Sequence, residues 1–537
     1  MDQLKLAPAG RSGFAVIELM IAMTIMLVVL VAVTTTSFGS QSFLISSQTN
    51  AEALNLAQEL LENEQAEARK DFNFVNDVAS STDDIYEKAV YVSLRPDLLT
   101  KEVKALISWK DEHKATRFLE LTTLIANFDT PVGGNTCNSN LSGDWHNPTI
   151  ENVGSTNFAS LVGDAGGTYT LSDLDAYRGK LYVTASNTSA PTKPTFFVFD
   201  ISDPTPDLLG KVDNEGSGGT VSAGLNAVKV AEDPASSPVK TYAYVANAYG
   251  ADYSTCNPAT TKNCGQLAII DVTPPTFWSF WNPSITNLAL ATSSAPFVTG
   301  NWMGNALFYR SGYLLFGLAK AGGAGPEFHI VDVHNENLNF LTGSAAHLLF
   351  PVGSYTVGHD VNSVNLRGTY AYVTIPNDPS AKELQIIDMQ NPSTMTLAGG
   401  FDMSGGGNGK SLYLVGNRLY FGNTVPSIGN DLHVLDNTSP NSTLPEIAGT
   451  NLATSLNAIV VRNTLAFLLT NTSLEVFDVG DPHSTSAFSI GSAVGTLALP
   501  SSGSATEPSM DCEGNRLYII ANDATGHGSL YVIKPGP

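Results

Sequence analysis

The clearest pattern along the chain is a continuous apolar run near its N-terminus. Residues 14–33 read FAVIELMIAMTIMLVVLVAV, and their polar side chains are Glu18 and Thr24. Such a run rises about 30 Å as an α-helix, which matches the hydrocarbon core of a bilayer. Residues 51–69 contain strong helix formers and neither Gly nor Pro, and their apolar positions partly follow helical spacing. The pattern predicts one long helix over 14–69 that is membrane-spanning first and amphipathic later.

The helical pattern gives way to short alternating segments further along the chain. Residues 89–95, 102–109 and 117–126 read as strands, because apolar and polar positions alternate in them. These strands predict a small antiparallel subdomain over 70–130. The residues that follow, 131–145, are rich in Gly, Asn, Ser and Thr and read as a linker.

The remaining part of the chain, 146–537, repeats one pair of strand patterns. A strand of LYV type is followed, after a variable loop, by a strand of the form apolar-x-apolar-apolar-Asp. These second strands end at Asp200, Asp271, Asp332, Asp388, Asp436 and Asp478, and a seventh ends at Lys534. Their mean spacing is about 56 residues, and compact turns with Gly or Asn precede the LYV strands. Successive hairpins with four strands per unit predict an all-β propeller of seven blades.

The aspartate that recurs at the end of the second strand reads as a turn cap and not as a catalytic group. A polar or Pro-containing turn follows it, as in DISDP over 200–204 and DVGDP over 478–482. An aspartate side chain in this position can accept a hydrogen bond from the backbone N–H two residues further on. We therefore expect the repeated carboxylates to hold turns.

Charge and motifs narrow the functional classes. The chain has 50 acidic and 27 basic residues, which gives a formal net charge of −23, so nucleic acid is not expected as a partner because phosphate contacts need clustered Lys and Arg. The nine His are scattered, and H-E-x-x-H, G-x-S-x-G and P-loop motifs do not occur. We expect neither an enzyme activity nor a cofactor or metal. The alternative of a propeller hydrolase or quinone-type dehydrogenase stays open, although the five Trp do not recur once per blade.

The four cysteines suggest disulfides. Cys256 and Cys264 flank a short polar loop, where a disulfide is expected. Cys137 lies just before the propeller and Cys512 lies in its last blade. Because the two ends of a closed ring meet, a bond between Cys137 and Cys512 would clasp the ring; two unrelated free thiols are the alternative.

The residues around the start of the apolar run carry a resemblance to a known family. A short polar leader, 1–13, contains Lys5 and Arg11, so the N-terminus should stay in the cytoplasm and the rest should be exported. The run from Gly13 and Phe14 to Glu18, GFAVIE, resembles the cleavage and assembly motif of type IV pilins and type II secretion pseudopilins. The resemblance implies that a prepilin peptidase cuts after Gly13, that Phe14 is then methylated, and that Glu18 guides assembly. A helix followed by a small antiparallel sheet is also similar to a pilin head.

Glu18 has a physical reading of its own. A carboxylate within a membrane helix costs about 2–3 kcal/mol, so it usually has a function and a partner. The partner available in a packed filament is the N-terminal amine of Phe14 on a neighbouring subunit. The alternative is a plain signal anchor with an incidental glutamate near the membrane interface.

The repeats carry a second resemblance. Their signature, G-x-x-AYV followed by apolar-x-IID-x-x-x-P, resembles the LVIVD-type repeat of bacterial surface propellers over roughly 150–537. Together the two resemblances imply an α+β pilin-like module, with a long helix and a small antiparallel sheet, followed by an all-β propeller.

The function expected from these features is that of a minor type IV pilin or pseudopilin. Its helix would assemble into a filament, and its propeller would serve adhesion or other surface or substrate binding. The implied partners are prepilin peptidase, other pilin or pseudopilin subunits, the inner-membrane assembly machinery and an unknown extracellular ligand. The chain would cross the inner membrane once before assembly and then belong to a surface pilus or a periplasmic pseudopilus. A membrane-anchored propeller enzyme or scaffold that never enters a filament is the alternative.

Overall fold

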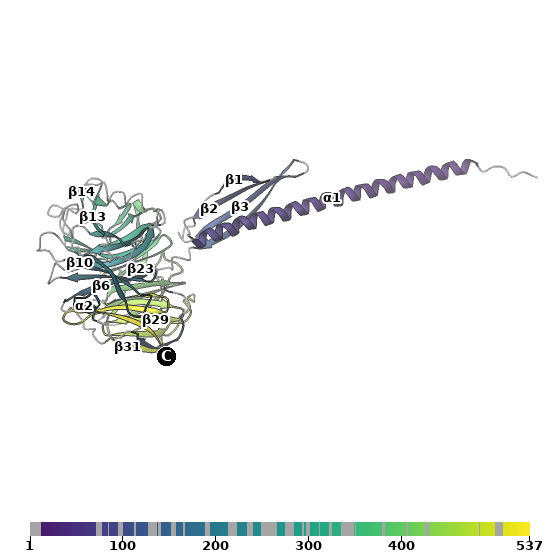
Figure 1. The fold of residues 1–537 in the computed structure, drawn as a ribbon. Helices are drawn as coiled ribbons and strands as arrows, with labels where there is room; N and C mark the ends of the chain where they lie inside the picture. Colours follow the sequence, from purple (N-terminus) through teal and green to yellow (C-terminus); the bar gives the residue numbers. More distant parts are fainter. Residues whose placement is uncertain are drawn as a thin grey trace, which may run out of the picture. The chain divides into compact units, whose positions relative to one another are not determined.

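The chain divides into two compact units, Met1–Asn127 and Phe128–Pro537, which are described separately here (Figure 1). The structure is a computed structural model. It describes residues 12–70, 78–83, 85–94, 100–111, 114–126, 137, 141–151, 157–164, 167–187, 194–212, 223–233, 240–248, 266–273, 284–292, 295–296, 301–310, 312–321, 325–333, 348–349, 351–377, 382–403, 406–424, 429–482, 484–499 and 508–537.

The first unit is built on one long helix, α1 (Ser12–Lys70), which Figure 1 shows as a continuous coil. Gly39, the one helix-breaking residue type within the run 14–48, does not interrupt it. The span Val16–Gln41 is long and apolar enough to cross a membrane and is fully exposed. The helix predicted over 14–69 is therefore present as a single element.

A four-stranded antiparallel sheet packs against the C-terminal half of α1. Its order is β1 (Val78–Asp83), β2 (Tyr86–Leu94), β3 (Thr100–Lys110) and β4 (Thr116–Ala126). The helix residues in the core of this unit are Ala53, Ala57 and Leu61, and the alternating residues Val103, Ala105 and Ile107 of β3 are buried with them. The three strands read from the alternation correspond to β2, β3 and β4. The sequence of β1, VASSTD, has too few apolar positions to show that pattern.

The second unit consists of antiparallel sets of four strands. The first two sets are β6 (Thr170–Tyr177), β7 (Lys180–Asn187), β8 (Phe196–Asp200) and β9 (Asp207–Val212), and β10 (Ala223–Asp233), β11 (Lys240–Asn247), β12 (Leu267–Asp271) and β13 (Ser284–Thr292). The next two are β15 (Asn301–Arg310), β16 (Tyr313–Ala321), β17 (Phe328–Asp332) and β19 (Gly353–Tyr355), and β20 (Ser363–Arg367), β21 (Tyr370–Thr374), β22 (Leu384–Asp388) and β23 (Thr396–Phe401). Two further sets are β24 (Asn408–Val415), β25 (Arg418–Thr424), β26 (Leu432–Asp436) and β27 (Glu446–Thr450), and β28 (Leu456–Arg462), β29 (Leu465–Thr470), β30 (Ser473–Asp478) and β31 (Gly495–Ala498). The last set is β32 (Ser509–Glu513), β33 (Arg516–Asn522), β34 (Gly528–Gly536) and β5 (Asp144–Ile150).

A few short elements complete the unit. They are β14 (Ala295–Pro296), β18 (Leu348–Leu349), the helix α2 (Phe158–Leu161) and a 3₁₀ turn, η3 (Pro392–Thr394). The first two sets form one ten-stranded sheet with β14 and β18, because β10 pairs briefly with β7.

The sets are arranged as in a propeller-like all-β fold. The first strand of each set contacts the first strand of the next set along the chain, from β6 through β10, β15, β20, β24 and β28 to β32, and β32 contacts β6. The last set takes its outermost strand, β5, from the beginning of the unit. The chain therefore returns to its starting point, and residues far apart in sequence complete one sheet.

The middle strands of the sets are buried on both faces. In β8, Phe196, Phe197, Val198 and Phe199 are all essentially inaccessible, and LAII of β12 and LQII of β22 are equally enclosed. A strand between two neighbouring sheets has no solvent face, so it reads as a continuous apolar run and not as an alternating one. This burial explains why the repeat can be recognised in the sequence by its apolar LYV and IID patterns.

The repeated aspartate is confirmed as a turn cap. Its Oδ1 accepts from the backbone N–H two residues later, as from Ser202 to Asp200 at 2.8 Å and from Gln390 to Asp388 at 2.9 Å. The same bond holds the turns after Asp271, Asp436 and Asp478. These carboxylates stabilise the turn between the third and fourth strands.

Candidate functional site

The residues of the leader motif lie in the first turns of α1. Gly13 and Phe14 are helical, but their side chains are outside the described residues. Glu18 is exposed within the apolar half of the helix, and among the described residues it has no hydrogen-bond or ion-pair partner. Its carboxylate is therefore available to a group outside this chain.

The hydroxyl groups in the same apolar span are satisfied within the helix itself. Thr24 Oγ1 donates to the Met20 carbonyl at 2.7 Å, and Thr36 Oγ1 donates to the Ala32 carbonyl at 2.7 Å. Thr34 and Thr35 make equivalent bonds one turn back. A hydroxyl that bonds its own helix can enter an apolar medium at little cost, whereas Glu18 needs an external partner. By length and composition, the span can serve as a membrane anchor or a signal sequence.

A polar cavity of about 240 Å³ lies along the first strands of the sets in the second unit. Every set contributes residues to its lining, for example Ser172 from β6, Asn226 from β10 and Lys410 from β24. The cavity corresponds to the axis around which the first strands contact each other. It is a candidate site for ligand binding to which all seven sets contribute.

Asparagine side chains at the edge of this cavity join one set to the next. Asn226 Nδ2 donates to the Gly304 carbonyl at 2.8 Å, and Asn305 Nδ2 donates to the Val361 carbonyl at 2.7 Å. Asn362 donates in the same way to the Gly409 carbonyl at 2.7 Å. Asn226 and Asn305 lie at register shifts in their strands, which turn the side chain out of the pleat. These amides stabilise contacts between neighbouring first strands.

The sequence analysis did not predict these asparagine hydrogen bonds between sets, although the sequence contains a motif that marks them. A short motif of Asn followed by Ala or Ser precedes the apolar part of four first strands: LNA at 225–227, GNA at 304–306, VNS at 361–363 and LNA at 456–458. It repeats with the period of the LYV strands. Its role became visible only when the strands were placed side by side, because the bonds of Asn226, Asn305 and Asn362 cross from one set to the next. Asn457 bonds within its own set.

A buried cluster of charges lies where β6, β10 and β32 meet. Lys229 Nζ is 2.6 Å from Asp175 Oδ1, and the Asp175 side chain is 3% exposed. The second oxygen of Asp175 accepts from the Val230 N–H at 2.8 Å. Asp511 lies on β32 and accepts from the Ala176 N–H at 2.8 Å. Three strands from different parts of the chain thus share one charge cluster.

The cluster holds more carboxylates than cations. Burial raises the pKa of the Asp511 carboxyl to about 7, although Lys229 acts to lower it. Its Oδ1 atom has no hydrogen-bond partner among the described residues. Burial alone would lower the pKa of Lys229, but Asp175, Asp511 and Asp173 raise it above its ordinary value. Lys229 therefore stays charged, while burial raises the pKa of the Asp175 carboxyl as well as that of Asp511.

A stability dependence on pH follows from Asp511. The unfolded carboxyl loses its proton near pH 4, while the folded one keeps it to about pH 7. Folding therefore loses stability as the pH rises through this window and levels off above it. We expect Asp511→Asn to flatten the dependence, measured as denaturant midpoints of the full chain at pH 5 and pH 8.

The control for Asp511→Asn is the same substitution at a second acidic residue. Asp203→Asn, in an exposed turn, should leave the difference between the two midpoints unchanged. An Asp511→Asn variant with the same difference as the unmodified chain would show that Asp511 is ionised in the folded state throughout the range.

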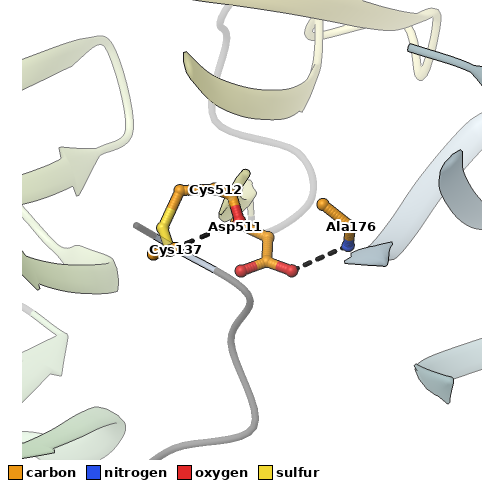
Figure 2. The surroundings of a disulfide bond; sticks show 4 residues. All are labelled: Cys137, Ala176, Asp511 and Cys512. Atoms are coloured by element: carbon orange, nitrogen blue, oxygen red, sulfur yellow. Dashed lines mark hydrogen bonds between the residues drawn. A yellow bond between two sulfur atoms is a disulfide. The ribbon is translucent and has the colours of Figure 1, made fainter. Parts of the chain in front are cut away.

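The disulfide expected between the ends of the second unit joins Cys137 to Cys512, with their Cα atoms 5.2 Å apart. Figure 2 shows Asp511 beside this bond, with one carboxylate oxygen directed at the Ala176 N–H. Among the described residues, Cys137, Asp511 and Cys512 are close enough together to hold a metal ion, but the disulfide occupies both sulfur atoms. Cys256 and Cys264 lie outside the described residues.

Comparisons with known proteins bear on the repeat. The family described as LVIVD repeat matches residues 358–403, which contain the set β20–β23. No curated protein sequence matches the chain. Kluyveromyces lactis Hsv2p is 11% identical at a TM-score of 0.35, covering 76% of this chain and 99% of that chain. Kluyvelomyces marxianus Hsv2 is 7% identical at a TM-score of 0.31, covering 72% and 92%. Likenesses at such TM-scores carry no argument, so the propeller-type repeat region is supported by the LVIVD match and the sheet topology.

Proposed function

We propose that this chain is a minor type IV pilin or pseudopilin that displays a seven-bladed propeller outside the cytoplasm. The N-terminal helix inserts into the inner membrane, is cut after Gly13 by a prepilin peptidase and methylated at Phe14, and then enters a filament. The propeller binds a surface or a substrate. Its partners are other pilin or pseudopilin subunits, the assembly machinery and an extracellular ligand.

The observation that carries the proposal is the contrast between Glu18 and the threonines of the same apolar span. The threonines bond within their own helix, but Glu18 has no partner among the described residues. An unpaired carboxylate in an apolar medium is costly. The amine of a neighbouring Phe14 would neutralise it and fix the axial position of one subunit against the next.

The strand contacts support the seven-bladed form. Each set of four strands is one blade, and the set β32–β34 is completed by β5, which comes from the other end of the unit. The contact of β32 with β6 joins the first strand of the last set to the first strand of the first set. A closed ring leaves few open sheet edges, which suits a domain displayed outside the cell.

The test compares filaments made with and without Glu18. We expect the unmodified subunit in sheared filaments, with an intact mass that starts at methylated Phe14. Glu18→Ala should be cut and methylated but lost from filaments, at least tenfold, because the subunit cannot pair with its neighbour. Quantitative mass spectrometry of filament and membrane fractions measures both properties.

Thr24→Ala is the matched control, since it removes a polar group whose bond lies within the helix. It should assemble like the unmodified subunit. A subunit that keeps Met1 and stays in the membrane fraction would overturn the proposal and leave an anchored propeller scaffold. Equal incorporation of Glu18→Ala would remove the assembly role of Glu18.

A further inference from the structure

The first described residues of the second unit, 137 and 141–151, are fastened to the last set of strands. Cys137 forms the disulfide with Cys512 and a parallel bridge with Gly514. Ser142, five residues after Cys137, is bonded to Asn515. Asn515 Nδ2 donates to the Ser142 carbonyl at 2.9 Å, and Asn515 Oδ1 accepts from the Ser142 N–H at 3.2 Å. The turn between β32 and β33 therefore holds the segment before β5 begins.

Strand β5 is held by noncovalent contacts, whereas the residues before it are held by a disulfide. It is the outermost strand of its set and pairs only with β34, with a register shift in the pairing. Trp145 anchors it in the core, where its ring meets that of Phe467 edge-to-face at 5.0 Å. Hydrogen bonds, the buried ring of Trp145 and the ion pairs of Glu151 with Arg516 and Lys534 keep this seam closed.

The order of these contacts along the chain determines which strand receives a force applied at the N-terminus. We propose that the Cys137–Cys512 disulfide passes tension from the N-terminal helix directly into β32, so that the β5 seam carries none. Cys137 precedes β5 in the sequence, and the covalent bond is met before the seam. Strand β32 pairs with β33 and contacts β6 and β28, so it lies inside the ring. The inference rests on the proposed function only in taking the helix as the anchored end.

The disulfide acts here as a mechanical bypass. A head that is bound to a surface while its filament is pulled would otherwise open by losing β5. With the bond intact, a covalent link and not a row of hydrogen bonds receives the pull. Opening then requires strands inside the ring to separate, and these are buried on both faces.

A single-molecule pulling experiment tests the bypass. The full chain in detergent micelles carries one handle at its N-terminus and one in a peptide tag inserted after Asn441, which is exposed. In the oxidised protein the shorter path between the handles runs through Cys512. In Cys137→Ser/Cys512→Ser the path runs from β5 onward, and it should extend about fourfold further by residue count. The first opening should also need a lower force.

Trp145→Ala weakens the seam and separates the two cases. It should lower the first opening force in the disulfide-free chain and leave it unchanged in the oxidised one. If Trp145→Ala lowers the force equally in both, or if both chains extend equally, the bypass does not exist. Reduction of the folded, tethered wild type with dithiothreitol replaces the double variant if that variant does not fold, and Cys256→Ser/Cys264→Ser controls for the other cysteines. No filament is involved, so a failure here and a failure of the pilin proposal are distinguishable.

Discussion

Replacing Lys229 with methionine is expected to lower the free energy of unfolding of the propeller by about 3–5 kcal/mol. The ammonium lies 2.6 Å from Asp175 Oδ1; the Asp175 side chain is 3% exposed and that of Lys229 is 21% exposed. The ammonium also stabilises the charged form of Asp511. Without it, two buried carboxylates lose their cation while remaining bonded to backbone N–H groups of neighbouring strands. Urea denaturation of the full chain, followed by tryptophan fluorescence, measures the loss.

Two further variants show whether the loss comes from the charge cluster. Lys211→Met, on the outermost strand β9, should change the unfolding free energy by less than about 0.5 kcal/mol. Adding Asp175→Asn to Lys229→Met should restore part of the loss, because it removes one of the carboxylates left without a cation. If Lys229→Met is as stable as the unmodified chain, the cluster does not hold the three strands together.

Removal of the Cys137–Cys512 bond is expected to have the second large effect on stability. The bond closes a stretch of 375 residues, and in the chain-entropy model its loss costs about 6 kcal/mol. Cys137→Ser/Cys512→Ser should therefore unfold at clearly lower denaturant than the wild type, in a titration under oxidising conditions.

The other cysteine pair provides the comparison of loop length. A bond between Cys256 and Cys264 would close a much shorter loop and contribute about 2–3 kcal/mol in the same model. Cys256→Ser/Cys264→Ser should thus cost less than the Cys137/Cys512 variant. The reverse order would mean that the long closure does not restrict the unfolded chain.

The parts of the fold that sequence predicted are those in which local pattern and burial agree. The middle strands are apolar throughout because they are enclosed on both faces, and the aspartate caps use a bond that spans only two residues. The long helix combines strong helix formers with an apolar run. None of these features needs knowledge of a distant part of the chain.

The ring-closing strand shows where local reasoning ends. Strand β5 reads DWHNPTI, which contains a Pro and little alternation, and its first residues fell within the predicted linker, 131–145. It is a strand because β34, nearly four hundred residues later, supplies its hydrogen bonds. Pairing over such a distance leaves no periodic trace in the segment itself.

The charge cluster was missed for a related reason. Asp175, Lys229 and Asp511 come from three separate strands, and each is flanked by ordinary strand residues. Only the ring brings β6, β10 and β32 together. By contrast, Glu18 was visible because its neighbours in sequence are also its surroundings, and its role in assembly stays a prediction.

The position of β5 in the sequence determines when its set of strands can be completed during synthesis. Chains emerge N-terminus first during synthesis, so β5 is made long before β34, the strand with which it pairs. Cys137 likewise waits for Cys512 while Cys256 and Cys264 appear earlier. The last set of strands therefore stays incomplete until β34 has been made. Cys137 must stay free to pair with Cys512 over that interval, and loss of β34 would leave β5 without its pairing partner.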